Sequence, residues 1–217
     1  NEDQIVEVEI DLNELKKNDV VIVPQGWGSR GVEGKLKVIK YARENKMPYL
    51  GLCFGMQMAV VEFARNVLNM GGANSVEADE KTKYPVIHLM EHQKDNLESK
   101  NYGGTIRLGD WPCKLKNKSI ISECYNKFGK NRIIDEKGVQ VVQERHRHRY
   151  EFNNDYRQQL EKAGLVVSGT SLDNKLVESI ELNKKDHPFF VATQFHPEYK
   201  SRPLSPHPIF MGLIESG

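Results

Sequence analysis

Apolar positions in the first quarter of the chain form two short runs on either side of a periodic segment. Residues 20–23 are a β-branched run, which is typical of a strand buried on both faces, as in a parallel sheet. Residues 24–34 contain Pro and several Gly and are expected to form a loop, and residues 35–45 carry apolar side chains at three-residue steps, which predicts a helix. Residues 47–52 are a second apolar strand. This part of the chain therefore predicts a β-loop-α-β unit.

A second helix is expected directly after this unit. From Met56 to Val67 the apolar side chains fall at positions i, i+3, i+4, i+7 and i+11, which places them on one face of a helix. Gly71 and Gly72 then supply a stop.

The remainder of the chain mixes loops with further strands. Residues 91–104 are almost entirely polar and predict a surface loop, for which a lid is one use. Residues 139–150 are expected to form a strand, and residues 153–155 are expected to cap a helix that ends at Gly164. Three more strands, separated by turn signals, are expected to be antiparallel neighbours: residues 165–168, 176–182 and 189–195. The elements together predict one α/β domain, with a mostly parallel central sheet flanked by helices and a small antiparallel extension.

Composition excludes several classes of protein. The 217 residues include 38% hydrophobic and 28% charged side chains, which fits a globular domain and not a disordered or collagen-like chain. The 31 Lys and Arg against 30 Asp and Glu give a net charge of +1, so no overall field attracts nucleic acid or an anionic membrane. No apolar run approaches the ~20 residues of a membrane span. The 3 cysteines, with no C-x-x-C pair, favour a reducing compartment and hence a cytoplasmic protein.

The segment from Gly51 to Gly55 has the spacing of a nucleophile elbow, with Cys53 at its centre. It lies where the second strand gives way to the helix, and the two glycines leave room for a sharp, strained turn. A helix N-terminus is expected to lower the pKa of the thiol and so to favour the thiolate. The alternative is a small buried core cysteine, which is the commoner fate of a lone Cys.

A cysteine nucleophile needs a base, and the base needs a group that fixes its tautomer. His196, Pro197 and Glu198 follow the last apolar strand, so His196 is expected at a strand end with Glu198 in reach of its ring. Alone, this triplet is as consistent with an ordinary turn after a strand. Combined with the elbow, it predicts a Cys-His-Glu triad.

Residues 144–151 read Glu-Arg-His-Arg-His-Arg-Tyr-Glu. In a strand, His146 and His148 share one face and the three arginines share the other. A zinc site is disfavoured because no third and fourth ligand is recognisable, and a nucleic-acid strip is disfavoured by the net charge. A guanidinium that binds a substrate carboxylate is the better functional interpretation. The alternative is a solvated, charged edge strand.

Several strings of the sequence together resemble the glutamine amidotransferase domain of CTP synthases, over a region from about Val20 to the C-terminus. The elbow and His-Pro-Glu mark the class I, triad-type amidotransferases in general, whereas R-H-R-H-R-Y and G-G-T-I-R-L-G point to CTP synthases. The resemblance implies the class I, flavodoxin-like fold. It rests on residues 51–57, 73–77, 103–109, 144–151 and 194–198.

The resemblance also implies a reaction. Cys53 is expected to attack the side-chain amide of L-glutamine, His196 to pass the proton to the leaving ammonia, and Glu198 to orient His196. The γ-glutamyl thioester is then hydrolysed. Backbone N–H groups of Gly26 and Phe54 are implied as the oxyanion hole. The glutamine-binding residues implied in the same way are Gly26, Phe54, Gly55, Met56, Gln57, Glu77 and Arg149, with Arg149 on the α-carboxylate.

The resemblance further implies partners outside this sequence. A synthetase domain of the same polypeptide, similar to nothing in this sequence, would use the ammonia with ATP and magnesium to convert UTP to CTP. The domain in hand is expected to need no cofactor and no metal of its own. GTP is implied as an activator of glutamine hydrolysis, and the full-length enzyme as a homotetramer. The residues implied to respond to GTP are Arg30, Gly31, Glu33 and Arg107.

Two features depart from the family pattern. The family loop usually reads P-G-G-F-G, whereas here Gln25 stands at the first of these glycines. If that position needs a positive φ, Gln25 is strained by about 1 kcal/mol and the oxyanion hole is displaced. The family's first strand and following helix are not recognisable ahead of residues 5–10, so residues 1–217 are expected to be a glutaminase domain that lacks these elements and the synthetase domain.

Two other functions are kept as alternatives to a glutaminase. One is a weakly active regulatory or scaffolding module of the same fold, in which Gln25 disturbs the oxyanion hole. The other is a γ-glutamyl hydrolase, which would act on folate or peptide conjugates; closure of Glu77 and Arg149 around a free amino acid would argue against it.

Overall fold

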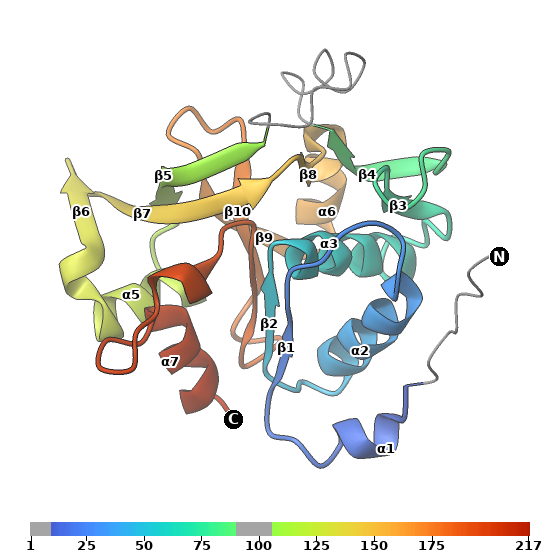
Figure 1. Ribbon diagram of the computed structural model, residues 1–217, viewed down its shortest axis with the longest axis horizontal. Coiled ribbons are helices and arrows are strands. Elements are labelled where there is room, and N and C mark those ends of the chain that lie inside the picture. Colours follow the sequence, from blue (N-terminus) through green and yellow to red (C-terminus); the bar gives the residue numbers. More distant parts are fainter. Residues whose placement is uncertain (1–9, 90–105) are drawn as a thin grey trace, which may run out of the picture.

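The computed structural model describes residues 10–89 and 106–217 (Figure 1). The polar loop expected at 91–104 and most of the segment 5–10 lie outside the described residues. The helices are α1 (Leu12–Leu15), α2 (Val32–Glu44), α3 (Phe54–Asn66), α5 (Ile120–Phe128), α6 (Arg157–Lys162) and α7 (Pro208–Glu215), with 3₁₀ turns η2 (Lys130–Arg132), η3 (Asn154–Tyr156) and η4 (Pro197–Lys200). The strands are β1 (Val21–Val23), β2 (Tyr49–Leu52), β3 (Ala73–Ser75), β4 (Tyr84–Leu89), β5 (Arg107–Leu115), β6 (Ile133–Glu136), β7 (Val139–His148), β8 (Tyr150–Phe152), β9 (Leu165–Thr170), β10 (Val177–Leu182) and β11 (Phe190–Thr193).

The central sheet has 8 strands in the order β1-β2-β11-β10-β9-β5-β7-β6. Strands β1, β2 and β11 are parallel to one another, and every pair from β11 to β6 is antiparallel. The predicted α/β fold and the antiparallel neighbours β9, β10 and β11 are confirmed. The antiparallel part is larger than the small extension we expected, so the sheet is mixed and not mostly parallel. Part of the reason is the β6–β7 hairpin, which turns at Lys137 and Gly138, both with positive φ.

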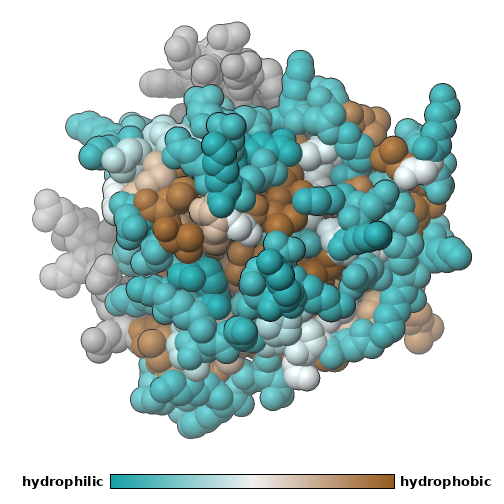
Figure 2. All heavy atoms as spheres, turned by 180° about the vertical axis from the view of Figure 1, so that it is seen from behind, coloured by the Kyte–Doolittle hydropathy of each residue, from teal (hydrophilic) through white to brown (hydrophobic). Residues whose placement is uncertain are grey.

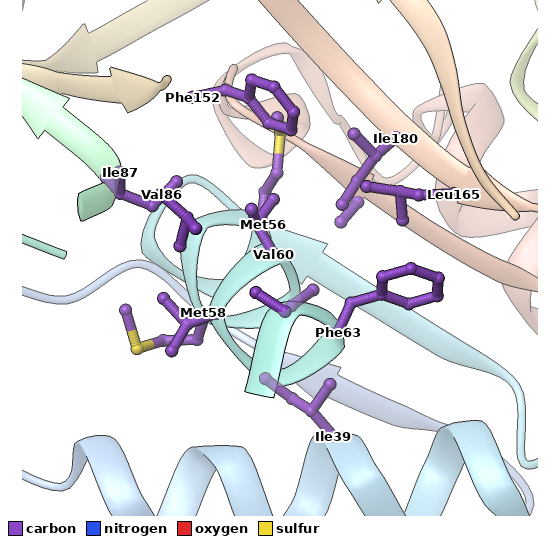
Figure 3. Packing of buried hydrophobic residues seen from close by; sticks show 14 of the residues in the cluster. Ile39, Met56, Met58, Val60, Phe63, Val86, Ile87, Phe152, Leu165 and Ile180 are labelled. Atoms are coloured by element: carbon purple, nitrogen blue, oxygen red, sulfur yellow. The ribbon is translucent and has the colours of Figure 1, made fainter. Parts of the chain in front are cut away.

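Helices cover both faces of this sheet. The strand alternation explains the two layers, because Tyr49 packs into one apolar cluster with α2 and α3, whereas Leu50 packs into a second cluster with α5 and α7. Figure 3 shows α3 inside the first cluster: Met56 points toward Phe152, while Ile39 of α2 lies on the opposite side of the helix. This burial on all sides is unusual for a helix, and it fixes the N-terminus of α3 firmly against the sheet.

A second sheet of 3 strands, β3-β4-β8, was not predicted from the sequence. It arises because the expected strand 139–150 divides at Arg149: β7 ends at His148 in the central sheet, and β8 pairs with β4 in the small sheet. Val86, Ile87 and Phe152 of this sheet pack on α3 (Figure 3). Arg149 therefore stands where the chain passes from one sheet to the other.

The helix starts differ slightly from the prediction. The helix α2 begins at Val32 after Gly31, which adopts φ 70°, and α3 begins at Phe54, directly after the expected nucleophile.

In the described parts of the chain no helix is long and apolar enough to cross a membrane. Figure 2 shows hydrophilic residues over most of the face opposite to that of Figure 1, with hydrophobic residues in smaller groups among them.

Candidate active site

The three parallel strands deliver the predicted site residues to one edge of the sheet. Because β1, β2 and β11 run in the same direction, their carboxyl ends lie side by side, with Val23 paired to Gly51 and Thr193 paired to Leu52. The loop with Gly26 follows β1, Cys53 follows β2, and His196 follows β11. Ligands of α/β sheets bind at this kind of edge.

Cys53 occupies the strained turn that the elbow spacing predicts. Its backbone has φ 52° and ψ −100°, a conformation that costs a non-glycine residue roughly 1–3 kcal/mol. Its N–H donates to the carbonyl of Thr193 at 2.7 Å, which ties the turn to β11. A Cβ on Gly55 would lie 2.1 Å from the carbonyl oxygen of Val23, and one on Gly51 would lie 2.6 Å from Tyr49 Oη. Both elbow glycines are therefore required by packing.

The thiol of Cys53 does not have the lowered pKa that we expected. Burial raises the pKa of this thiol to about 12, the N–H of Phe54 at the helix start lowers it, and the charges of Glu198 and Glu77 raise it further. The helix N-terminus acts in the predicted direction, but desolvation of a side chain that is only 5% exposed outweighs it. Cys53 is therefore a thiol at neutral pH in this structure and needs a base to become a nucleophile.

His196 and Glu198 have the arrangement of a base with its orienting carboxylate. The ring Nδ1 lies 2.7 Å from Glu198 Oε1, and the ring stacks on Tyr199 at 4.8 Å between centroids. Because an ionised carboxylate only accepts, Nδ1 carries the hydrogen and Nε2 keeps its lone pair. Nε2 is buried and has no hydrogen-bond partner. With Nδ1 held by Glu198, Nε2 is the ring nitrogen of His196 that is left for a neighbour at this edge of the sheet.

The two residues expected to form the oxyanion hole, Gly26 and Phe54, are in contact through the Phe54 ring. The N–H of Phe54 acts on the sulfur of Cys53, and the α-carbon of Gly26 packs on the Phe54 ring, where a Cβ would come within 3.2 Å. Gln25 is exposed and does not belong to the residues with positive φ. The condition under which we expected strain at Gln25 is therefore not met.

The residues expected to bind glutamine surround this edge from three elements. Burial raises the pKa of Glu77, while an N–H bond from Gly28 at 3.1 Å and the positive charge of Arg149 lower it. Glu77 and Arg149 are thus neighbours of opposite charge. Gln57 Nε2 donates to the carbonyl of Tyr150 at 3.0 Å, and its buried Oε1 has no partner.

Two of the expected glutamine-binding residues, Met56 and Gly55, place no side chain at the site. The Met56 side chain points elsewhere, and Gly55 has no side chain. Met56 is fully buried, and its side chain points into the apolar core around α3 (Figure 3). Gly55 accepts a hydrogen bond from Tyr49 Oη at 2.9 Å through its carbonyl.

Gln194 is a site residue to which the sequence interpretation gave no role. Its Nε2 lies 3.5 Å from Cys53 Sγ, and its Oε1 accepts from Gln57 Nε2 at 3.3 Å. It is 1% exposed. The available signal was its place two residues before His196, which puts both side chains on the same side of an extended segment.

The residues implied to respond to GTP do not form one cluster of free side chains. Arg30 is exposed, Gly31 caps α2, and Glu33 pairs with Arg65 at 2.8 Å. Arg107 is 6% exposed and pairs with Glu178 at 2.7 Å. Direct contact between Arg107 and a nucleotide would require it to leave this buried pair.

Metal binding finds no support in residues 10–89 and 106–217, where no group of three or more His, Cys, Asp or Glu could hold an ion. The neighbouring His146 and His148 are engaged with each other at 3.1 Å.

Comparisons with known proteins agree with this geometry. The family described as "Glutamine amidotransferase class-I" matches residues 2–216. Proteins named CTP synthase from Caldanaerobacter subterraneus subsp. tengcongensis and Bacillus subtilis are 57% and 56% identical over 93% and 90% of this chain. This chain covers only 34% of the length of each, so it spans about a third of these relatives. The glutaminase domain of Trypanosoma brucei CTPS, solved with bound acivicin, is 33% identical with a TM-score of 0.80, covering 94% of this chain and 74% of that one.

Proposed function

Because the chain belongs to the class I glutamine amidotransferases and closely matches the glutaminase region of CTP synthases, we propose that it hydrolyses L-glutamine to glutamate and ammonia through Cys53, His196 and Glu198. The observation that carries this proposal is the oriented imidazole of His196. Its Nδ1 is held by Glu198, and its unpartnered, buried Nε2 belongs to the same sheet edge as the strained Cys53 turn.

The proposed reaction proceeds in two stages. Nε2 of His196 takes the proton from Cys53 Sγ as the sulfur attacks the amide carbon of glutamine, and the imidazolium gives that proton to the departing nitrogen, which leaves as ammonia. Water, deprotonated by the same Nε2, then attacks the γ-glutamyl thioester and releases glutamate and the thiol. The net change is glutamine plus water to glutamate plus ammonia.

The raised pKa of Cys53 fits this general-base route. A thiol whose pKa is about 12 holds little thiolate at neutral pH, so proton transfer to His196 has to accompany the attack. The N–H of Phe54, already directed at the sulfur, and that of Gly26 would stabilise the oxyanion, and each such donor contributes about 3 kcal/mol in the transition state.

The two ends of the substrate meet groups of opposite charge. Arg149 presents a guanidinium for the α-carboxylate, and Glu77 presents a carboxylate for the α-ammonium. The unpartnered Oε1 of Gln57 offers an acceptor to an N–H of the substrate. The proposed substrate is therefore an amino acid whose α-carboxylate and α-ammonium are both charged.

The test is labelling by 6-diazo-5-oxo-L-norleucine together with ammonia release from glutamine. We expect stoichiometric labelling at Cys53, and a loss of hydrolysis of at least about a thousandfold in Cys53→Ala and in His196→Ala. Cys124→Ser is the matched control, because Cys124 is a buried cysteine on α5 outside the site, and it should keep both activities. A folded wild-type protein that is neither labelled nor active would favour the regulatory-module alternative.

The use of the ammonia is a further part of the proposal. We propose, from the resemblance to CTP synthases, that a synthetase domain of the same polypeptide consumes it with ATP and magnesium to aminate UTP, with GTP as activator, in a cytoplasmic homotetramer. The high identity to proteins named CTP synthase supports this assignment. Glutamine-dependent formation of CTP by the purified protein, with an ammonium salt as the alternative nitrogen source, would separate the two half-reactions.

A further inference from the structure

Four charged or titratable side chains are buried inside the antiparallel part of the central sheet, and the proposed reaction does not use them. Arg107 Nη1 donates to Oε2 of Glu178 at 3.0 Å, and Nη2 forms an ion-pair contact with Oε1 at 2.7 Å. His146 lies 3.4 Å from Arg107 and 3.1 Å from His148. Each of the four is at most 6% exposed. The cluster connects strands β5, β7 and β10.

The histidine pair continues this cluster toward the active site. His148 Nδ1 lies 2.9 Å from the carbonyl oxygen of Tyr150. A carbonyl only accepts, so Nδ1 of His148 carries a hydrogen. Nε2 of His148 lies 3.1 Å from Nδ1 of His146, the ring nitrogen that also lies 3.4 Å from Arg107 Nη1. Burial, together with the charges around it, lowers the pKa of His146 well below its usual value, so this ring is neutral.

The same carbonyl of Tyr150 holds the side chain of Gln57. Gln57 Nε2 uses its two hydrogens on Tyr150 O at 3.0 Å and on Gln194 Oε1 at 3.3 Å. Gln194 Nε2 in turn lies 3.5 Å from Cys53 Sγ. With its NH₂ group engaged twice, the Gln57 amide has one orientation, and this orientation leaves Oε1 buried and without a partner.

We propose that His148 is a positioning residue for substrate recognition, because it fixes the Tyr150 carbonyl that orients the amide of Gln57. The inference rests on the proposed glutaminase function, since the acceptor that it sets up is Gln57 Oε1, offered to an N–H of the bound amino acid. Arg107 and Glu178 lie next to the histidine pair, at 3.4 Å and 3.6 Å from ring nitrogens of His146. A buried acceptor without a hydrogen-bond partner, such as Gln57 Oε1, costs free energy unless a ligand donates a hydrogen bond to it. Other groups therefore have to maintain the direction of this oxygen.

Two substitutions at His148 separate its two hydrogen bonds. In His148→Asn the amide nitrogen replaces ring Nδ1 and can still donate to Tyr150 O, whereas in His148→Gln the amide reaches toward His146 and leaves Tyr150 O without this donor. We expect His148→Gln to raise KM for glutamine about tenfold with a smaller change in kcat, and His148→Asn to stay within about threefold of the wild type. Equal loss in both variants would overturn the proposal.

The matched control is His187, a second buried histidine that bonds a backbone carbonyl, that of Ala42, at 3.0 Å. It precedes β11, whereas the site follows β11, so it belongs to the opposite end of the sheet. His187→Gln should lower the thermal midpoint and leave KM unchanged. If His148→Gln behaves in the same way as this control, His148 is only structural.

A double-variant cycle tests whether His148 acts through Gln57. If it does, adding His148→Gln to Gln57→Ala causes little further loss in kcat/KM, whereas independent roles make the losses multiply. Multiplying losses in folded variants would contradict the inference.

A spectroscopic measurement keeps the inference separate from the proposed function. Imidazole ¹⁵N spectra of the wild type should show hydrogen on Nδ1 of His148, and the Gln57 side-chain NH₂ signals should shift in His148→Gln but not in His148→Asn. This readout needs no turnover, so an inactive wild type would defeat the proposed function without deciding the hydrogen-bond chain. A hydrogen-free Nδ1 on His148 would defeat the chain itself.

Discussion

The central sheet has a parallel part, β1, β2 and β11, and an antiparallel part that continues through β10 to β6 (Figure 1). Polar residues are placed differently in the two parts. Strands β2 and β11 are buried at every position and consist mainly of apolar residues, and their chemistry begins only after they end, at Cys53 and His196. Strand β7 alternates exposed and buried residues, and Glu144, His146 and His148 are among the buried ones. The polar side chains of the antiparallel part therefore lie within strands, where each needs a partner.

The two parts of the sheet can also be compared by the hydrogen-bond partners of their buried polar atoms. At the ends of parallel strands, reactive side chains can remain unpartnered because a substrate is expected there, as for His196 Nε2 and Gln57 Oε1. Inside the antiparallel part, Oε1 of Glu144 is engaged by Tyr125 at 2.7 Å and by His207 at 3.1 Å, while Glu144 Oε2 and Glu178 Oε1 are buried without a hydrogen-bond partner. Buried polar atoms of the antiparallel part are therefore only partly satisfied, although no substrate is expected there.

The largest effect is expected from breaking the Arg107–Glu178 pair. Arg107→Met leaves a fully buried carboxylate without its cation, and should lower the free energy of unfolding by about 4 kcal/mol, measured by urea denaturation at neutral pH. The double variant Arg107→Met/Glu178→Met removes both charges and should be more stable than the single variant. A double variant at least as unstable as the single one would show that the pair itself, and not the orphaned charge, determines stability.

A somewhat smaller effect is expected in the parallel part, from Gly55→Ala. The added methyl would lie 2.1 Å from the carbonyl oxygen of Val23, so α3 has to move away from β1. We expect a loss of about 3 kcal/mol in the free energy of unfolding together with a loss of glutaminase activity, because the turn at Cys53 moves too. Gly71→Ala is the control, since no atom lies within 4 Å of the new methyl. Full activity in Gly55→Ala would show that the elbow tolerates displacement.

The parallel part of the sheet was easier to predict from the sequence than the antiparallel part. The elbow glycines, Cys53 and the triplet from His196 to Glu198 are local strings, and the strand and helix around them carry clear apolar patterns. Arg107 is 39 residues from His146 and 71 residues from Glu178, and the three meet only because β5, β7 and β10 belong to one sheet. A local sequence pattern therefore does not predict that these three residues meet.

Two particular failures have physical causes. Strand β5 contains Gly109 and Pro112, residues that usually argue against a strand, and Pro112 is accommodated opposite Gln143 in the ladder with β7. The pKa of Cys53 was expected to fall because the helix start is visible in the sequence, whereas the burial that raises this pKa arises only when the chain folds around the thiol. Solvent exclusion at a site is a property of the fold and not of a motif.

The smallest expected effect concerns Glu181 on β10, a buried carboxylate of the antiparallel part. It accepts N–H bonds from Ile120 at 3.0 Å and Ile121 at 3.3 Å at the start of α5, yet burial dominates and raises the pKa of Glu181 to about 7. The folded state thus holds this proton more tightly than the unfolded chain, whose value is 4.5. The resulting stability is fully present below about pH 4.5 and is lost as pH rises through about 7.

Glu181→Gln mimics the protonated form and lacks this titration. The free energy of unfolding of the wild type relative to Glu181→Gln should therefore fall by about 2 kcal/mol between about pH 5 and about pH 8, measured by urea denaturation across that range. The same substitution at the exposed Glu136 controls for the loss of one negative charge. A difference that stays constant or grows with pH would mean that the helix start of α5 stabilises the carboxylate more than burial destabilises it, and the antiparallel part would then tolerate an anion through backbone donors alone, as the parallel part does at its strand ends.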